Sequence, residues 1–168
     1  MIIVSDTSPI LNLAVIGQLH LLPKLYGTVV VPQAVYTEIV IRGTGQIGAM
    51  EVAQANWIEC KQIANRPLVT SLEGELDIGE AEAIVLAVEL KDVLLLIDER
   101  KGRIVANRLG VNSIGLLGIL IKAKHEGLIL AVGLLMDELR AKAGFWIGDD
   151  LYNRVLQAAG ESAMDDIQ

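Results

Sequence analysis

The sequence predicts an α/β sandwich with a mainly parallel central sheet. Short runs of β-branched residues and leucine alternate with longer amphipathic segments, which is the pattern of successive βαβ units. The composition is 52% hydrophobic and the mean hydropathy is +0.48. This suits a sheet buried on both faces and a further apolar surface covered in an oligomer. At 168 residues, the chain is long enough for one such domain.

Strands are predicted where short apolar runs end at turn-forming or polar residues: at 1–5, 27–31, 57–63, 93–97 and 111–114. Helices are predicted in the amphipathic segments between them: at 8–22 with a break near Gly17, 32–41, 50–56, 79–90, 102–109 and most of 115–158. Ser8 is expected to cap the first helix, with Pro9 in its first position. Three or four of these strands, with the helices between them, are enough to make a doubly wound sandwich.

Two stretches are expected to lack regular structure. Residues 65–78 are polar and irregular, and residues 161–168 are predicted to form a frayed tail, so that a single domain spans residues 1–160. No apolar run approaches the roughly 18–20 residues needed to cross a bilayer, and the start of the chain lacks the features of a signal peptide. We therefore expect no membrane association.

The cysteine and histidine content restricts the chemistry. Cys60 is the single cysteine, which excludes an internal disulfide and favours a cytoplasmic location. With only His20 and His125 besides, one chain cannot assemble a zinc site of the Cys/His type. Any bound metal is expected to have oxygen ligands.

Charge is distributed unevenly along the chain. The net charge of −7 argues against general coating of nucleic acid. Basic residues nevertheless concentrate after residue 99, at Arg100, Lys101, Arg103, Arg108, Lys122, Lys124, Arg140 and Lys142. This stretch has two interpretations: it steers a polyanion toward the preceding acidic residues, or it forms a solvated helix face.

Acidic residues stand where apolar segments stop. They are Asp6, Glu38, Glu80, Glu82 and Asp98. The carboxyl ends of parallel strands meet at one edge of a sheet, where sites form in such folds. Carboxylate oxygens are the ligands that Mg²⁺ and Mn²⁺ prefer, and a divalent ion would offset the repulsion among converging acids. The pattern predicts metal-assisted phosphodiester chemistry.

Each acidic residue also has a structural interpretation. Asp6 and Asp98 precede predicted helices and are suited to cap them, and Glu38 has Arg42 four residues on as a surface ion pair. These roles and the metal-site role stay open at this stage.

The helix at 79–90 offers two candidate acids. Asp77 and Glu80 have the spacing of a capping box, which gives Glu80 a purely structural role. Glu82 lies beyond that box between two alanines, which would leave its carboxylate open to a cleft. The sequence therefore favours Glu82 over Glu80 as the functional residue.

Several segments of the chain resemble PIN-domain proteins, in the prokaryotic branch related to the ribonuclease toxins of toxin–antitoxin pairs. The matching segments appear in the expected order and are VSDTSPILNLA, VVVPQAVYTEI, LDIGEAEAIVLAVEL, LLLIDERKGRIVANRLG, IGLLGILIKAKHEGLI and GFWIGDDLYNRVLQAAGE. The resemblance implies a PIN-like three-layer α/β/α sandwich. It also implies Mg²⁺- or Mn²⁺-dependent cleavage of RNA, frequent homodimers and, for toxin members, inhibition by a small antitoxin protein.

The resemblance assigns roles to residues of this chain. The acidic positions of the family fall on Asp6, Glu38, Glu82 and Asp98, and the EAEA string, which adds Glu80, is similar to the paired metal-binding glutamates of flap endonucleases. Supporting positions fall on Thr7, Ser8 and Glu99, the last in place of a second aspartate. Arg100, Lys101 and Arg103 are expected to contact phosphates.

Other functions remain open. The main alternative is a non-catalytic module whose vestigial site binds RNA or protein. A further one is phosphoryl transfer through Asp6 as nucleophile, which usually requires a second aspartate where Ser8 stands. Trp146 and Tyr152 are expected to fill a dimer core, with stacking on bases as the alternative, and His125 is expected in a solvated turn.

Overall fold

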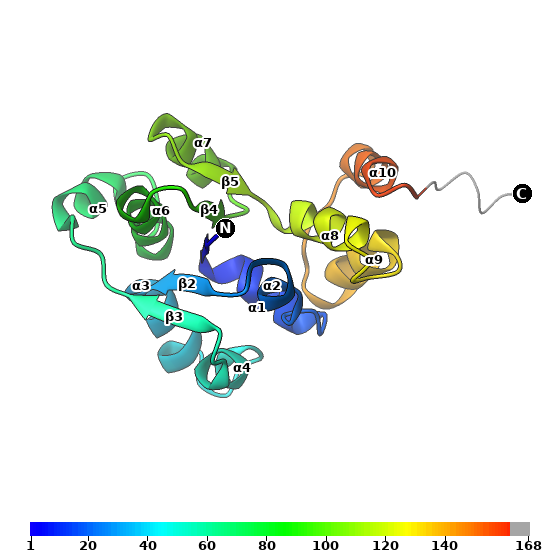
Figure 1. Ribbon diagram of the computed structural model, residues 1–168, viewed down its shortest axis with the longest axis horizontal. Helices are drawn as coiled ribbons and strands as arrows, with labels where there is room; N and C mark the ends of the chain where they lie inside the picture. Colours follow the sequence, from blue (N-terminus) through cyan, green and yellow to red (C-terminus); the bar gives the residue numbers. More distant parts are fainter. Residues whose placement is uncertain (162–168) are drawn as a thin grey trace, which may run out of the picture.

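In the computed structural model, which describes residues 1–161, five parallel strands form one sheet with helices on both faces (Figure 1). The strand order is β3-β2-β1-β4-β5. The strands are β1 (Ile3–Ser5), β2 (Val29–Pro32), β3 (Ile58–Lys61), β4 (Leu94–Leu96) and β5 (Asn112–Ile114). All five predicted strand positions are confirmed. Because every neighbouring pair is parallel, the carboxyl ends of the strands lie at the same edge of the sheet.

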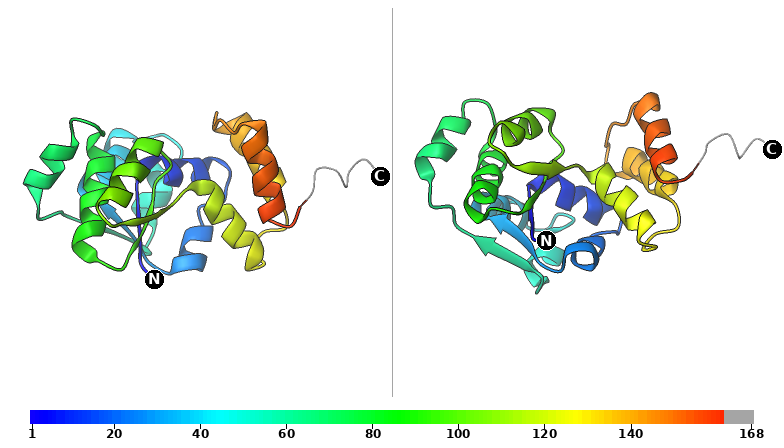
Figure 2. Two further views of the ribbon diagram at one scale, coloured as in Figure 1. Left: turned by 90° about the horizontal axis from the view of Figure 1, so that it is seen from above. Right: turned by 45° about the horizontal axis from the view of Figure 1, so that its top comes forward.

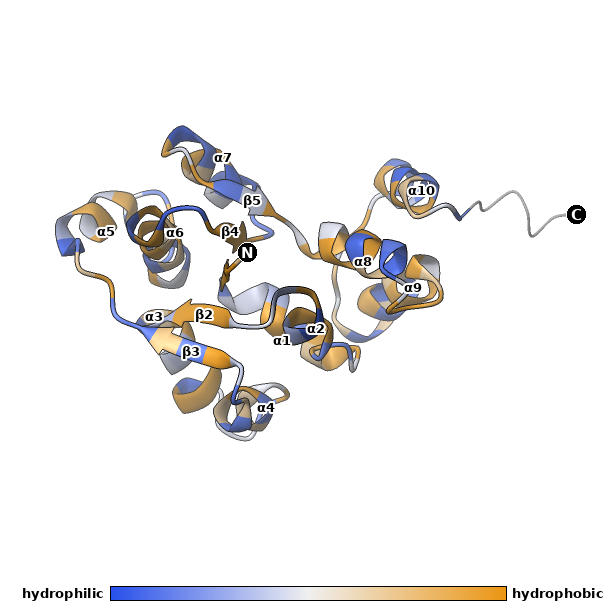
Figure 3. Cartoon of the chain, viewed as in Figure 1, coloured by the Kyte–Doolittle hydropathy of each residue, from blue (hydrophilic) through white to orange (hydrophobic). Residues whose placement is uncertain are grey.

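The sheet separates two hydrophobic cores. Ile3, Val29 and Val31 belong to one core, and Val4 and Val30 belong to the other. This alternation follows from the two-residue period of a strand. It explains why neither face of β2 and β4 is polar, as the colouring of β2 in Figure 3 shows. The fold is the predicted three-layer α/β/α sandwich.

Helices cover each face as separate groups. One core is completed by residues of α1 (Thr7–Val15), α2 (Leu21–Tyr26), α3 (Gln33–Tyr36), η1 (Thr37–Arg42), α4 (Ala49–Gln54), α8 (Leu116–His125), α9 (Val132–Lys142) and α10 (Asp149–Ala158). The other is completed by residues of α5 (Arg66–Leu72), α6 (Ile78–Leu90) and α7 (Arg100–Arg108). Both figures place α8, α9 and α10 side by side, at the end of the molecule away from α5 (Figures 1 and 2).

The α6 helix has an unusual environment for its acidic residues. Every residue from Gly79 to Ala87 is buried, because the helix packs on the sheet with α3, α5 and α7 around it. Glu80 and Glu82 are therefore buried carboxylates, with exposed fractions of 8% and 4%. Buried carboxylates require hydrogen-bond donors, a cation or a proton.

Three local predictions need correction. The first helix begins at Thr7 with Asp6 in the N-cap position, so Ser8 is not the cap. The helix predicted from Pro32 changes after Tyr36 into a π-helix, η1, which carries Glu38. Gly43 follows η1 directly, and a Cβ there would overlap the carbonyl oxygen of Ile39.

The third correction concerns residues 65–78, which contain helix α5 rather than irregular chain. Asn65 caps α5 by accepting a hydrogen bond from the Leu68 N–H at 3.1 Å, and a proline occupies the first turn. Of the tail predicted at 161–168, residues 162–168 lie outside the described residues, whereas Glu161 accepts hydrogen bonds from the Val132 and Gly133 N–H groups. None of the helices within residues 1–161 has the length and apolar character needed to cross a membrane.

Candidate active site

Asp6 is the buried centre of an acidic cluster. Its N–H continues the β1–β4 ladder by donating to the Leu96 carbonyl at 3.0 Å, and its side chain lies at the carboxyl edge of the sheet. Asp6 is 5% exposed. Burial is the main cause that raises the pKa of its carboxyl group to about 7; the charges of Asp77, Glu38 and Asp98 contribute to the rise, and the Thr7 backbone hydrogen bond opposes it.

Glu38 reaches this cluster from η1. The Thr7 hydroxyl donates to Oε2 of Glu38 at 2.8 Å, and Thr7 is itself buried next to Asp6. This hydrogen bond spans 31 residues of chain and fixes the orientation of an otherwise exposed carboxylate. A π-helical turn contains one more residue between hydrogen-bonded groups than an α-helical turn, and such turns occur often at functional sites.

Gly79 marks the point where three carboxylates converge. A Cβ added to Gly79 would lie 3.4 Å from Oε2 of Glu38, 3.5 Å from Oδ1 of Asp6 and 3.5 Å from Oδ1 of Asp77. These oxygens belong to three separate segments of the chain. Glycine leaves the space between them open, so the three carboxylates surround one small volume at the start of α6.

Asp77 has two functions in this geometry. Its Oδ1 accepts a hydrogen bond from the Glu80 N–H at 2.8 Å and so caps α6. The same carboxylate is one of the three around Gly79. The sequence predicts only the capping role of Asp77. Its position one turn before Glu80, at the same sheet edge as Asp6, is the signal that it also belongs to the site.

Glu80 lies between α6 and α7, close to Asp6 and Asp77. A Cβ on Gly102 would lie 3.2 Å from its Oε2, so α7 approaches closely only because that residue is glycine. Burial raises the pKa of the Glu80 carboxyl group, and a side-chain hydrogen bond with Asp77 and the charges of Asp77 and Asp6 raise it further. Glu80 is thus a buried acid among other acids.

Asp98 enters from the end of β4. Its Oδ1 accepts a hydrogen bond from the Leu116 N–H at 2.8 Å, whereas its Oδ2 is buried without a hydrogen-bond partner among the described residues. Burial raises the pKa of its carboxyl group, and the Leu116 N–H and the Arg103 guanidinium oppose that rise. A buried carboxylate oxygen without a donor is the kind of atom that a cation would satisfy.

The structure does not bring Glu82 into this cluster. Its Oε1 accepts a hydrogen bond from the Ala34 N–H at 3.0 Å, and its Oε2 pairs with Arg66 at 2.9 Å. Two residues along an α-helix correspond to a rotation of about 200°, so Glu80 and Glu82 point to opposite sides of α6. The arginine partner lies 16 residues away in the segment predicted to be irregular.

The remaining predicted residues line the rim. Ser8, Glu99 and Arg100 line a cavity of about 350 Å³ that includes Asp98. Lys101 and Arg103 are exposed on α7, and Nη1 of Arg103 and Oδ1 of Asp98 both lie against Gly115. The basic start of α7 therefore adjoins Asp98, and its side chains are also exposed to solvent, so both interpretations of the basic stretch stay open.

Comparison with known proteins identifies the family. A family model described as a PIN domain matches residues 2–161 of this chain. The chain belongs to the PIN-domain family. PIN domains are a superfamily of nucleases that usually depend on metal ions.

One solved structure supports the PIN fold. It is a PilT N-terminus domain protein from the hyperthermophilic archaeon Sulfolobus solfataricus P2, with a TM-score of 0.52 and 19% sequence identity, covering 88% of this chain and 98% of that one. At this identity the similarity concerns the fold alone. None of the curated proteins compared with the chain matches it.

The donor set of this PIN domain suits a hard divalent cation. All the converging side chains present carboxylate oxygens, and burial raises the pKa values of Asp6, Glu80 and Asp98. Within residues 1–161, however, no three acidic, histidine or cysteine side chains already form a closed ligand group. The carboxylates surround a common volume, but their oxygens are not close enough together to form a metal-ligand group.

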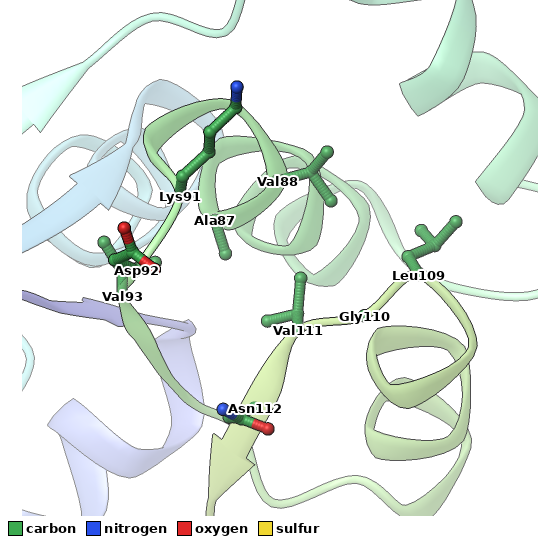
Figure 4. Close-up of a pocket in the computed structure, with 9 residues that line it drawn as sticks. All are labelled: Ala87, Val88, Lys91, Asp92, Val93, Leu109, Gly110, Val111 and Asn112. Carbon is green, nitrogen blue, oxygen red and sulfur yellow. The ribbon is translucent and has the colours of Figure 1, made fainter.

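A second cavity lies at the opposite edge of the sheet. It measures about 330 Å³ and is lined by Ala87, Val88, Lys91, Asp92, Val93, Leu109, Gly110, Val111 and Asn112 (Figure 4). In Figure 4 the Lys91 side chain extends away from Val111 and Asn112. Only Lys91 and Asp92 carry charge there, so the groups suited to metal-dependent chemistry gather at the carboxyl edge.

Proposed function

We propose that this PIN domain is a metal-dependent endoribonuclease that hydrolyses phosphodiester bonds. The observation that supports it is the convergence of Asp6, Glu38 and Asp77 on the space above Gly79, with Glu80 and Asp98 beside them. In this proposal Asp6, Glu38, Asp77 and Asp98 hold Mg²⁺ or Mn²⁺ and Glu80 supports them. Glu82 has a structural role instead.

Different residues would position the metal ligands and contact the substrate. When bound, the ion would neutralise charge on the phosphate and activate water, so that a hydroxide oxygen bonds to phosphorus, the P–O ester bond breaks and the leaving oxygen gains a proton. Thr7 holds Oε2 of Glu38, and the Leu116 N–H holds Oδ1 of Asp98 and leaves Oδ2 free. Arg100, Lys101 and Arg103 would contact the phosphates, which offsets the acidic net charge locally.

The test is cleavage of labelled single-stranded and hairpin RNA by purified protein with Mn²⁺, Mg²⁺ or EDTA. We expect cleavage only with metal and a loss on the order of 100-fold or more in Asp6→Asn and Glu80→Gln. Glu82→Gln is the matched comparison, two residues along the same helix, and it should retain cleavage once folding is verified. Metal-independent cleavage, or loss in Glu82→Gln but not in Glu80→Gln, would contradict the proposal.

One observation favours a second candidate, a non-catalytic module that binds RNA or protein. It is the lack of a closed three-ligand group among the described residues. That candidate predicts RNA binding without cleavage in any metal, and binding that Asp6→Asn leaves intact. The two candidates are therefore separated by the same set of proteins.

A finer proposal makes the protein the toxin of a toxin–antitoxin pair, acting as a homodimer. It is supported by an apolar cavity of about 420 Å³ beside Glu38, lined mainly by Leu11, Val15, Ile39 and Ile47, which suits an apolar helix of a small partner. Co-purification with the product of an adjacent small reading frame, and suppression of RNA cleavage by it, would test the partner. Light scattering of the isolated protein would test the dimer.

A further inference from the structure

Trp146 is exposed although its neighbours are anchored. It is 85% exposed in the segment between α9 and α10, whereas Ile147 is 4% exposed and Phe145 packs against the core. An exposed ring suits both roles expected of Trp146, filling a dimer core and stacking on bases. A large aromatic ring presented to solvent by an ordered segment is typical of a recognition surface.

The local structure fixes the position of this ring. A Cβ on Gly148 would lie 3.1 Å from Cη2 and 3.6 Å from Cζ2 of Trp146, so one side of the indole rests on the glycine. Arg140 donates to the Ile147 carbonyl oxygen, forms an ion pair with Asp149 at 3.7 Å and stacks on the Tyr152 ring at 4.4 Å. The segment that carries Trp146 is thus tied to both flanking helices.

The ring forms a wall of the cavity that adjoins the carboxylates. This cavity of about 350 Å³ has Ala143, Gly144, Phe145 and Trp146 on one side. Its other lining residues are mostly polar or charged: Ser8, Asn12, Asp98, Glu99 and Arg100. The cavity thus combines the Trp146 ring, the Arg100 guanidinium and the candidate metal ligand Asp98. These groups suit one nucleotide, because the ring can stack on the base and the guanidinium can bind the phosphate.

We propose that this cavity is a subsite for an unpaired nucleobase, which stacks on Trp146 while the adjoining phosphate lies at Arg100. The inference rests on the proposed nuclease function and names its substrate class, single-stranded polynucleotide, because bases inside a duplex do not offer a free face. A second copy of the chain is the rival occupant. The charged lining disfavours it, since the centres of protein interfaces are depleted of charge.

The fluorescence of Trp146 itself reports on this subsite. The chain has two tryptophans, so Trp57→Phe leaves Trp146 as the sole indole. Trp57 packs against the core, next to the start of β3, away from the carboxyl edge. In Ca²⁺, with the oligonucleotide checked for integrity afterwards, oligouridine should quench Trp146 saturably. An abasic oligonucleotide of the same length should not.

Binding of labelled oligouridine gives the second readout. Trp146→Ala should weaken binding on the order of 5- to 100-fold, which corresponds to a stacking free energy of about 1–3 kcal/mol. Trp146→Phe should retain most of the affinity, and Trp57→Phe all of it. The salt dependence should be the same in Trp146→Ala as in the natural protein, because no phosphate contact is lost.

Two results would overturn the subsite: equal quenching by the abasic oligonucleotide, or unchanged affinity in Trp146→Ala, in particular where that substitution also converts a dimer to a monomer. That conversion would assign the ring to a second copy of the chain. The experiment requires no cleavage. Base-dependent quenching without cleavage would therefore overturn the nuclease proposal alone, and metal-dependent cleavage without quenching would overturn the subsite alone.

Discussion

Replacing Asp6 by asparagine is expected to stabilise the metal-free protein at pH 8. Asp6 is buried among other carboxylates, and its carboxyl group has a pKa of about 7. The Thr7 backbone N–H, which donates to this carboxylate, can donate equally to the side-chain oxygen of asparagine. The substitution removes the repulsion and nearly preserves the shape of the residue.

The pH dependence follows from proton binding. Folding raises the pKa of Asp6 from 3.8 to about 7, so the folded protein holds this proton more tightly than the unfolded chain does. The free energy of unfolding therefore falls as the pH rises through the interval between these two values. Above that interval, the stabilising contribution of the Asp6 proton is fully lost. At about 1.4 kcal/mol for each pKa unit, the upper limit of this loss is about 4 kcal/mol.

The assay is urea unfolding in EDTA at pH 8 and at pH 4.5 for the natural protein and Asp6→Asn. We expect the variant to be more stable by about 1–4 kcal/mol at pH 8 and by no more than about 1 kcal/mol at pH 4.5, where the folded protein keeps Asp6 protonated. Asp150→Asn, at an exposed position, is the control and should change stability by at most about 0.5 kcal/mol at either pH. Asp6→Asn that destabilises equally at both values would refute the reasoning.

Two further substitutions test the division of roles on α6. Arg66→Met should lower the free energy of unfolding in urea by about 1–2 kcal/mol because it removes the partner of buried Glu82. Arg108→Met, which breaks an exposed pair, should lower it by less than about 0.5 kcal/mol. Equal losses in the two variants would contradict a structural role of Glu82. Gly79→Ala should leave stability unchanged or raise it by up to about 1 kcal/mol, since its Cβ would meet oxygens at ordinary contact distances. Its methyl group should nevertheless weaken Mn²⁺ binding by about tenfold or more, and unchanged Mn²⁺ affinity would show that the ion does not occupy that space.

The architecture was largely predictable from the sequence because its signals are local. Runs such as Val29–Val31 carry both the β-propensity and the two-sided apolar character of a buried parallel strand. Helix α5 carries local signals, a cap at Asn65 and the helical spacing of Val69, Leu72 and Leu76, but it is only 7 residues long and lies in a largely polar segment, so these signals are weak in the sequence. The π-helical turn at 37–42 depends on packing rather than on a local signal.

The site was predictable in location but not in membership. Asp6 and Asp98 follow strands, so topology alone brings them to one edge. The choice between Glu80 and Glu82 required the rotation of α6, and the partner of Glu82, Arg66, lies in a segment that was not expected to be ordered. Capping and membership of the cluster were treated as alternatives, whereas Asp77 does both.

The most direct test of the carboxylate cluster as a metal site is a Mn²⁺ titration of the purified protein. Electron paramagnetic resonance measures the concentration of unbound Mn²⁺ at each step. The natural protein should take up Mn²⁺ saturably, Asp6→Asn should bind it at least about tenfold more weakly, and Glu82→Gln should match the natural protein. No uptake at millimolar Mn²⁺, or the same loss of affinity in Glu82→Gln as in Asp6→Asn, would contradict the account.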